Sequence, residues 1–112
     1  MQVATRRQGD VLVITVGEPR LDARGAGSFR ELVAEFIRAG HHRIVLNLAA
    51  VEFIDSSGLG ALVALLKTIG PRGELVLCGI QESIARLFQL THLDKVFVIL
   101  PGQEEALSKL AA

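Results

Sequence analysis

The sequence predicts a single α/β domain, in which helices pack on a mixed, largely parallel β-sheet of about five strands. Apolar runs of strand length alternate with segments whose apolar residues recur at helical spacing. The connections are short, and no linker, repeat or low-complexity stretch interrupts them. A chain of 112 residues is long enough to bury a hydrophobic core without disulfides. We therefore expect one domain over 1–112, with about four helices.

The first third of the chain is expected to hold a β-hairpin, a loop and a helix. Val3–Arg7 and Val11–Val16 flank a short segment that contains Gly and Asp, which is typical of a hairpin. Three glycines and a proline predict a loop over 17–27. From Ser28, the expected N-cap, apolar residues recur at helical spacing until Gly40 ends the helix.

The rest of the chain alternates strands with helices. Ile44–Leu48 and Glu74–Cys78 are almost continuously apolar, as expected for strands covered on both faces. Cys78 is expected to be a small buried hydrophobic residue. A further strand is predicted over Val96–Leu100. Helices are predicted from the Asp55-Ser-Ser-Gly segment to about Thr68, over Gln81–Leu90 and over Gln103–Ala112.

Composition and charge limit the function classes. Twelve Lys and Arg balance twelve Asp and Glu, which is not typical of a protein that binds nucleic acid through a general positive field. One cysteine excludes an internal disulfide and a cysteine-based zinc site. The longest strongly apolar run, Leu59–Leu66, is far shorter than the ~20 residues that span a bilayer. We expect a cytoplasmic protein that does not insert into a membrane. We also expect no direct nucleic-acid partner, no metal site and no cofactor.

The predicted helix after Asp55 is unusual, because apolar residues cover nearly every direction around its axis. A surface helix of this length normally has a polar face. Either this helix is fully buried, or its outward face is a docking surface. The mean hydropathy of +0.43, with only 4% aromatic residues, favours the docking surface, because the excess of apolar residues needs a location.

The start of the same helix, Asp55-Ser56-Ser57-Gly58, allows two interpretations. On the first, it is only a helix cap. On the second, an exposed hydroxyl accepts a phosphate, which the free N–H groups of a helix start stabilise, although Asp55 repels it. A phosphate adds about 1.5 to 2 negative charges beside an apolar docking face and would reject a partner fitted to the neutral hydroxyl. The residues alone do not decide between Ser56 and Ser57.

At these residues the chain resembles the STAS domain family, and within it the bacterial anti-sigma-factor antagonists. The resemblance rests on Ile44-Val-Leu-Asn-Leu, followed by Val51-Glu-Phe-Ile-Asp-Ser-Ser-Gly-Leu-Gly. It continues through Leu21-Asp22, Gly73-Glu-Leu-Val-Leu-Cys and Arg86-Leu-Phe, and so covers nearly the whole chain. It implies a STAS-like fold.

The resemblance also implies a phosphorylation switch. In that family the unphosphorylated antagonist binds a partner that is both anti-sigma factor and serine kinase, and thereby frees the sigma factor. Phosphorylation of the serine after the aspartate, here Ser56, prevents binding, and a PP2C-type phosphatase resets the cycle. Asp22 matches the family's early acidic loop near that serine. The family's usual Gly-Glu-Leu-Asp sequence is interrupted in this chain, because Pro19-Arg20 is inserted before Leu21. This insertion leaves the choice of partner open.

These inferences assign a role to each candidate residue. Ser56 would accept the phosphate and Asp22 would line the rim of the docking surface. The remaining candidates would shape the helix start (Asp55, Ser57 and Gly58) or supply apolar contact (Leu59 and Leu62).

Two other functions remain as alternatives. One is a STAS adaptor without a switch, such as a lipid-transporter subunit or a signalling scaffold, in which Ser56 is only a cap. The other is a small nucleotide-binding protein, suggested by Gly58-Leu-Gly. That motif has Val63 in place of a third glycine, and no phosphate-loop lysine follows. No arrangement of catalytic residues is evident, so we expect a protein that is not an enzyme.

Overall fold

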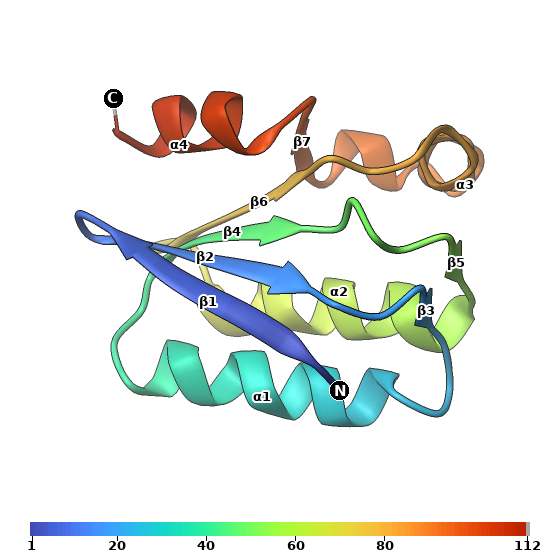
Figure 1. Ribbon diagram of the computed structural model, residues 1–112, viewed down its shortest axis with the longest axis horizontal. Helices are drawn as coiled ribbons and strands as arrows, with labels where there is room; N and C mark the ends of the chain where they lie inside the picture. The colour runs from blue at the N-terminus through green and yellow to red at the C-terminus, as the bar shows by residue number, and fades with distance from the viewer. Residues whose placement is uncertain (112) are drawn as a thin grey trace.

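The computed structural model describes residues 1–111, and a five-stranded sheet with helices on both faces forms its centre (Figure 1). In spatial order the strands are β1 (Val3–Gln8), β2 (Val11–Val16), β4 (Arg43–Asn47), β6 (Glu74–Cys78) and β7 (Val98–Leu100). The β1–β2 pair is antiparallel and the other neighbours are parallel. The predicted hairpin and the mixed, largely parallel sheet are therefore confirmed.

The helices lie on opposite faces of this sheet. Figure 1 shows α1 and α2 beneath the sheet and α4 above it. Within residues 1–111 the helices are α1 (Ala26–Arg38), α2 (Ser56–Ile69), α3 (Glu82–Leu90), the short 3-10 helix η1 (Leu93–Lys95) and α4 (Gln103–Ala111). None of the helices in this range is long and apolar enough to cross a membrane.

The central strands bury side chains on both faces, because successive residues of a strand point to opposite sides. In β4, Ile44 and Leu46 belong to the core that α1 and α2 cover, whereas Val45 belongs to the smaller core under α4. Cys78 joins the smaller core and is fully buried, as predicted. Burial raises the pKa of its thiol, so the side chain stays neutral and packs as an apolar group.

Helix α1 begins earlier than the sequence predicts. Gly25 occupies the N-cap position and contributes no side chain, so Ser28 lies inside the helix and the prediction of a Ser28 cap is wrong. The backbone carbonyl of Asp22 instead accepts hydrogen bonds from the N–H groups of Gly25 (3.0 Å) and Ala26 (2.8 Å). A backbone turn therefore starts the helix, and such a turn has no side-chain signature in the sequence.

The segment predicted as a loop over 17–27 contains a short strand. In it, β3 (Arg20–Leu21) pairs in parallel with β5 (Phe53–Ile54), and the two form a separate small sheet. Leu21 is fully buried and belongs to the core that α1 and α2 cover. Strands of two residues are too short for an apolar pattern to predict them. The pairing matters for function, because it brings the loop after β3 beside the start of α2.

The C-terminal elements follow the prediction with small differences. Strand β7 covers only part of the predicted Val96–Leu100 segment, because η1 precedes it and the buried Phe97 packs into the core before the strand begins. Helix α4 is described as far as Ala111, so the predicted end at Ala112 lies outside the described residues.

Helix α2 combines the two interpretations of its apolar sequence. One side is buried in the core that it shares with α1: Gly58, Ala61, Leu62, Leu65 and Ile69. The opposite side is half-buried or exposed: Gly60, Val63, Ala64, Leu66, Lys67 and Thr68. The helix is therefore partly core and partly surface, and its surface is more apolar than is usual for a helix on the outside of a sheet.

Two glycines of α2 give a matched test of this packing. A Cβ atom on Gly58 would clash with the carbonyl oxygen of Leu21, whereas a Cβ on Gly60 would meet nothing within 4 Å. We expect Gly58→Ala to lower the free energy of unfolding by about 1–3 kcal/mol, because β3 and α2 must separate. Urea unfolding monitored by circular dichroism measures the change.

Gly60→Ala is the control for this substitution. It should raise stability by about 0.5–1 kcal/mol, because alanine favours the helix and fits the open space. Equal stability of the two variants would show that α2 does not approach β3 as closely as described.

Candidate functional site

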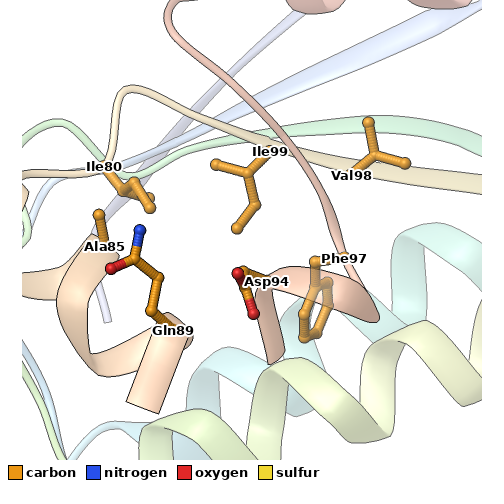
Figure 2. Close-up of a pocket in the computed structure, with 7 residues that line it drawn as sticks. All are labelled: Ile80, Ala85, Gln89, Asp94, Phe97, Val98 and Ile99. Atoms are coloured by element: carbon orange, nitrogen blue, oxygen red, sulfur yellow. The ribbon is translucent and has the colours of Figure 1, made fainter. Parts of the chain in front are cut away.

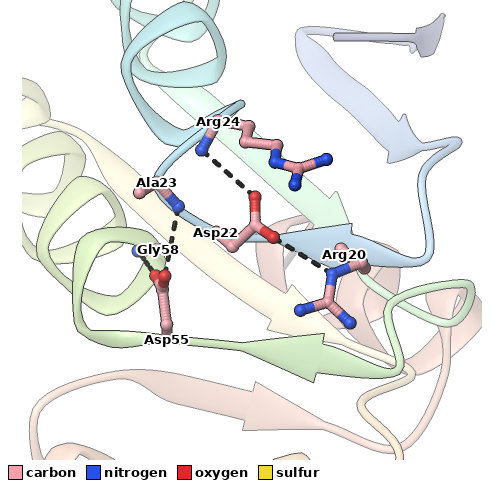
Figure 3. Close-up of polar contacts among 6 residues, drawn as sticks. All are labelled: Arg20, Asp22, Ala23, Arg24, Asp55 and Gly58. Atoms are coloured by element: carbon pink, nitrogen blue, oxygen red, sulfur yellow. Dashed lines mark hydrogen bonds and ion pairs between the residues drawn. The ribbon is translucent and has the colours of Figure 1, made fainter.

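The candidate residues gather where α2 begins, at the end of β5 and beside the turn that follows β3 (Figure 3). The parallel pairing of β3 with β5 sets Arg20 beside Phe53 and Leu21 beside Ile54. The segments after these two strands therefore leave the small sheet side by side. One segment carries Asp22 and the other carries Asp55. A hydrogen bond joins them between Ala23 and Asp55, which are 32 positions apart in the sequence.

Asp55 holds both segments together. One carboxylate oxygen, Oδ1, accepts a hydrogen bond from the backbone N–H of Gly58 at 3.0 Å and caps α2. The other, Oδ2, accepts from the backbone N–H of Ala23 at 3.1 Å (Figure 3). A cap of this kind stabilises a helix by about 1 kcal/mol. Asp55 thus fixes the start of the helix against the loop that contains Asp22.

Ser56 is the first residue of α2, and its side chain is exposed. Within residues 1–111 its hydroxyl makes no hydrogen bond, because Asp55 supplies the cap. The backbone N–H groups of Ser56 and Ser57 also have no partner in this range, as is normal for the first turn of a helix. The fold therefore leaves the Ser56 hydroxyl free, next to donors that stabilise an anion. Ser57 is also exposed.

Gly58 serves packing rather than ligand binding. It is buried, and the space that a side chain would need is taken by the Leu21 carbonyl and the Ile54 side chain. A phosphate-binding glycine must instead leave its backbone open to the ligand. The interpretation of Gly58-Leu-Gly as part of a nucleotide fingerprint thereby loses its structural basis.

The two leucines expected at the docking surface differ in their position. Leu62 is fully buried, because it points from α2 toward the sheet. Its predicted contact with a partner is therefore wrong, and Leu62 is a core residue. Leu59 is half-buried and packs against the edge of the same core, so part of its side chain is accessible.

Arg20 lies between Asp22 and Phe53. Sequence reasoning noted Arg20 only as part of an inserted pair and assigned it no role, and it did not single out Phe53. Phe53 is 41% exposed, and the Arg20 guanidinium carbon lies 4.2 Å from the centre of its ring. The same guanidinium donates from Nε to Oδ2 of Asp22 at 3.0 Å (Figure 3). The available signal was the alternation in β5, where Ile54 points inward and its neighbour Phe53 must point outward.

This arrangement sets the charge of Asp22. The hydrogen bond from Arg20 is the main reason that the pKa of the Asp22 carboxyl is held below its usual value of 3.8. The backbone N–H of Arg24, which donates to Oδ1 at 3.2 Å, lowers it further. The Asp22 carboxylate therefore stays ionised to a lower pH than usual and already has a cationic neighbour.

A separate hollow of about 440 Å³ lies beside β7, between α3 and η1 (Figure 2). Most of its lining is apolar, including Ile80, Phe97 and Ile99. The polar side chains among its lining residues are Gln89 and Asp94. This lining includes no cation for a phosphate and no pairing of a nucleophile with a base, so it offers no basis for nucleotide binding or hydrolysis.

Comparison with known proteins places these features in a family. The family model for the STAS domain matches residues 2–106. The anti-sigma-B factor antagonist of Staphylococcus epidermidis is 30% identical over 105 residues, which cover 93% of this chain and 96% of the relative.

Solved structures agree on the fold. An anti-sigma factor antagonist from Mycobacterium paratuberculosis superposes with a TM-score of 0.90 at 24% identity, covering 99% of this chain and 94% of the other. The unphosphorylated form of the anti-sigma factor antagonist SpoIIAA gives a TM-score of 0.75 at 19% identity and covers 99% of each chain. SpoIIAA of Bacillus in its phosphorylated form gives 0.73 at 20% identity, covering 97% of this chain and 99% of the other. With its α/β fold, its Asp-Ser-Ser-Gly helix start and these matches over nearly its full length, the chain belongs to the STAS domain family.

Proposed function

We propose that this protein is an anti-sigma-factor antagonist whose binding to an anti-sigma factor is switched off by phosphorylation of Ser56. The staphylococcal relative, an anti-sigma-B factor antagonist that matches over almost the whole length of both chains, supports the class of function. The free Ser56 hydroxyl at the start of α2 is the observation that carries the switch. That the related fold of SpoIIAA occurs in both unphosphorylated and phosphorylated forms supports it further.

The position of Ser56 explains how a phosphate would act without changing the fold. The side chain is exposed and takes no part in the hydrogen bonds that hold α2, so the added group needs no rearrangement. It would introduce about 1.5 to 2 negative charges beside Asp55. A partner surface fitted to a neutral hydroxyl would lose its contact with that hydroxyl. Binding would also require removal of water from the doubly charged phosphate, which is energetically costly.

The docking surface that we propose surrounds this hydroxyl. Leu59 and Phe53 supply accessible apolar area, and aromatic side chains are enriched where interfaces gain most of their binding energy. Asp22 and Arg20 form its charged rim. Asp55 and Gly58 fix the start of the helix. They therefore contribute to binding by positioning the residues that contact the partner. Ser57, exposed in the same turn, is the remaining contact residue.

The partner in this proposal is an anti-sigma factor that is also a serine kinase, and a PP2C-type phosphatase removes the phosphate. Such a cycle requires ATP and therefore operates in the cytoplasm. The alternative of an adaptor without a switch assigns Ser56 only a capping role. Asp55 makes the cap instead, so the Ser56 hydroxyl has no structural function among the described residues.

Phosphate mapping tests the proposed switch. The protein is incubated with ATP and an anti-sigma factor kinase from the same genome, and mass spectrometry locates the phosphate. We expect it on Ser56, with no phosphate on the Ser56→Ala variant. Ser56→Glu should weaken binding to the unloaded kinase at least about tenfold, or 1.4 kcal/mol, because a fixed negative charge replaces the hydroxyl.

Ser57→Ala is the control for phosphate mapping and Ser57→Glu is the control for folding, since they make the same changes one residue further along the exposed turn. Ser57→Ala should still be phosphorylated, and Ser57→Glu should keep its thermal melting temperature. If Ser56→Glu bound as tightly as the unmodified protein, the switch would be rejected and the adaptor function would stand.

The Arg20–Asp22 pair gives a prediction about charge at the rim. Arg20→Ala should raise the pKa of the Asp22 carboxyl toward 3.8, because the strongest stabiliser of its charged form is removed. In the unmodified protein the pair favours the folded state above pH 3.8, and this contribution is lost as the pH falls through the lowered pKa. NMR titration of the side-chain carboxyl carbon measures the shift.

Arg38→Ala is the control for this titration, because it also removes one partner of an exposed ion pair, with Glu31. It should leave the pKa of Asp22 unchanged. An Asp22 pKa that is equally low with and without Arg20 would contradict the pairing.

A further inference from the structure

A groove separates the exposed sides of α1 and α2. Its volume is about 560 Å³, and it is lined by Arg30 from α1 and by Gly60, Val63, Ala64, Lys67 and Thr68 from α2. Figure 1 shows these two helices side by side beneath the sheet. Helix α2 contributes most of the lining, so Gly60, Val63 and Ala64 from its outward side lie in the groove, whereas Leu66 lies outside it.

The groove carries positive charge that the described residues do not neutralise. Arg30 stands on one wall and Lys67 on the other, and neither forms an ion pair within residues 1–111. Arg38, on the same helix as Arg30, is by contrast paired with Glu31 at 2.7 Å. No acidic residue lines the groove, and α2 contains none along its whole length.

The groove is shallow and its floor is apolar. Val63 and Ala64 are half-buried there, and Gly60 has nothing within 4 Å of the place where a side chain would be. Small side chains let another helix approach the backbone closely. From Gly60 to Thr68 the α2 wall is about 12 Å long at 1.5 Å per residue, which matches two turns of a docked helix.

We propose that this groove docks an acidic amphipathic helix, which presents apolar residues to the floor and carboxylates to Arg30 and Lys67. Charge complementarity selects the acidic partner, and the small apolar floor selects a helix over an extended chain or a nucleic acid. The groove begins one helical turn after Ser56, on the same helix. The inference rests on the proposed function in identifying the helix as part of the anti-sigma factor, whereas the chemistry of the groove stands independently of the switch.

The groove and Ser56 would have separate roles in recognising the partner. The groove offers two cations and an apolar floor that phosphorylation leaves in place. The phosphate acts only at the start of the helix, where contact with a neutral hydroxyl is needed. A partner could thus be recognised by its acidic helix and then rejected at Ser56.

A synthetic peptide tests the groove without the natural partner. The probe is a capped helical peptide of about 14 residues, four turns long, with leucines on one side and glutamates on the other. A second peptide keeps the leucines and replaces each glutamate with lysine. We expect the acidic peptide to shift the backbone amide NMR signals of Gly60, Ala64 and Lys67, and the lysine peptide to leave them unchanged. Binding should weaken as the salt concentration rises, because salt screens exposed charges.

Charge reversal identifies the residues responsible. Arg30→Glu combined with Lys67→Glu should weaken binding of the acidic peptide by about tenfold or more, since two attractions become repulsions. Arg7→Glu and Arg72→Glu together make the same charge change at exposed positions outside the groove and should have little effect. Melting temperatures of both double variants verify that the fold is kept.

Several outcomes would overturn the proposal. They are failure of the acidic peptide to bind, equal binding of the lysine peptide, and preferential binding of a single-stranded oligonucleotide at the same amides. A shift of those amides with protein concentration alone would assign the groove to a second copy of the chain instead. Ser56→Glu should bind the peptide as the unmodified protein does, so this test can succeed or fail separately from the phosphorylation test.

Discussion

The two hydrogen bonds of the Asp55 carboxylate are the constraint on which the rest of the site depends. One caps α2 and the other holds the loop that follows β3, so the carboxylate joins a helix and a loop that are distant in sequence. The close contact of Gly58 with the Leu21 carbonyl reinforces this connection. Because Asp55 supplies the side-chain cap of α2, the Ser56 hydroxyl takes no part in capping and remains exposed. An exposed hydroxyl at a capped helix start is the arrangement that the proposed switch requires.

The apolar excess of the chain is distributed rather than collected in one patch. The inward side of α2 belongs to the core, and its outward side lines the groove beside α1. Other exposed apolar side chains lie near β7, where Leu90, Val96 and Val98 are accessible. The high mean hydropathy therefore has several structural origins. Only the part on α2 adjoins both the serine and a pair of uncompensated cations.

Arg20, in the pair that the family resemblance marks as an insertion, would shape the charge at the rim of the docking surface that we propose. Arg20 pairs with Asp22 and stacks on Phe53, so a single guanidinium links the acidic loop to the exposed aromatic ring. A partner cation that approaches Asp22 must therefore compete with Arg20. Such local competition is one way in which closely related folds distinguish between partners, because specificity depends on differences in affinity.

The fold class, the chain order of the longer strands and helices, the helix start at Asp55-Ser-Ser-Gly and the family could all be predicted from the sequence. These features follow from local periodicity, from capping residues and from a contiguous motif. Tertiary structure alone decided four points: the start of α1 at a backbone turn, the β3–β5 pair, the burial of Leu62 and the contact of Arg20 with Phe53. Each depends on which segments come to lie side by side, and the helical pattern of α2 could not show which of its apolar sides would face the sheet. The same reason applies to the groove, because Arg30 and Lys67 lie on different helices and oppose each other only after these have packed.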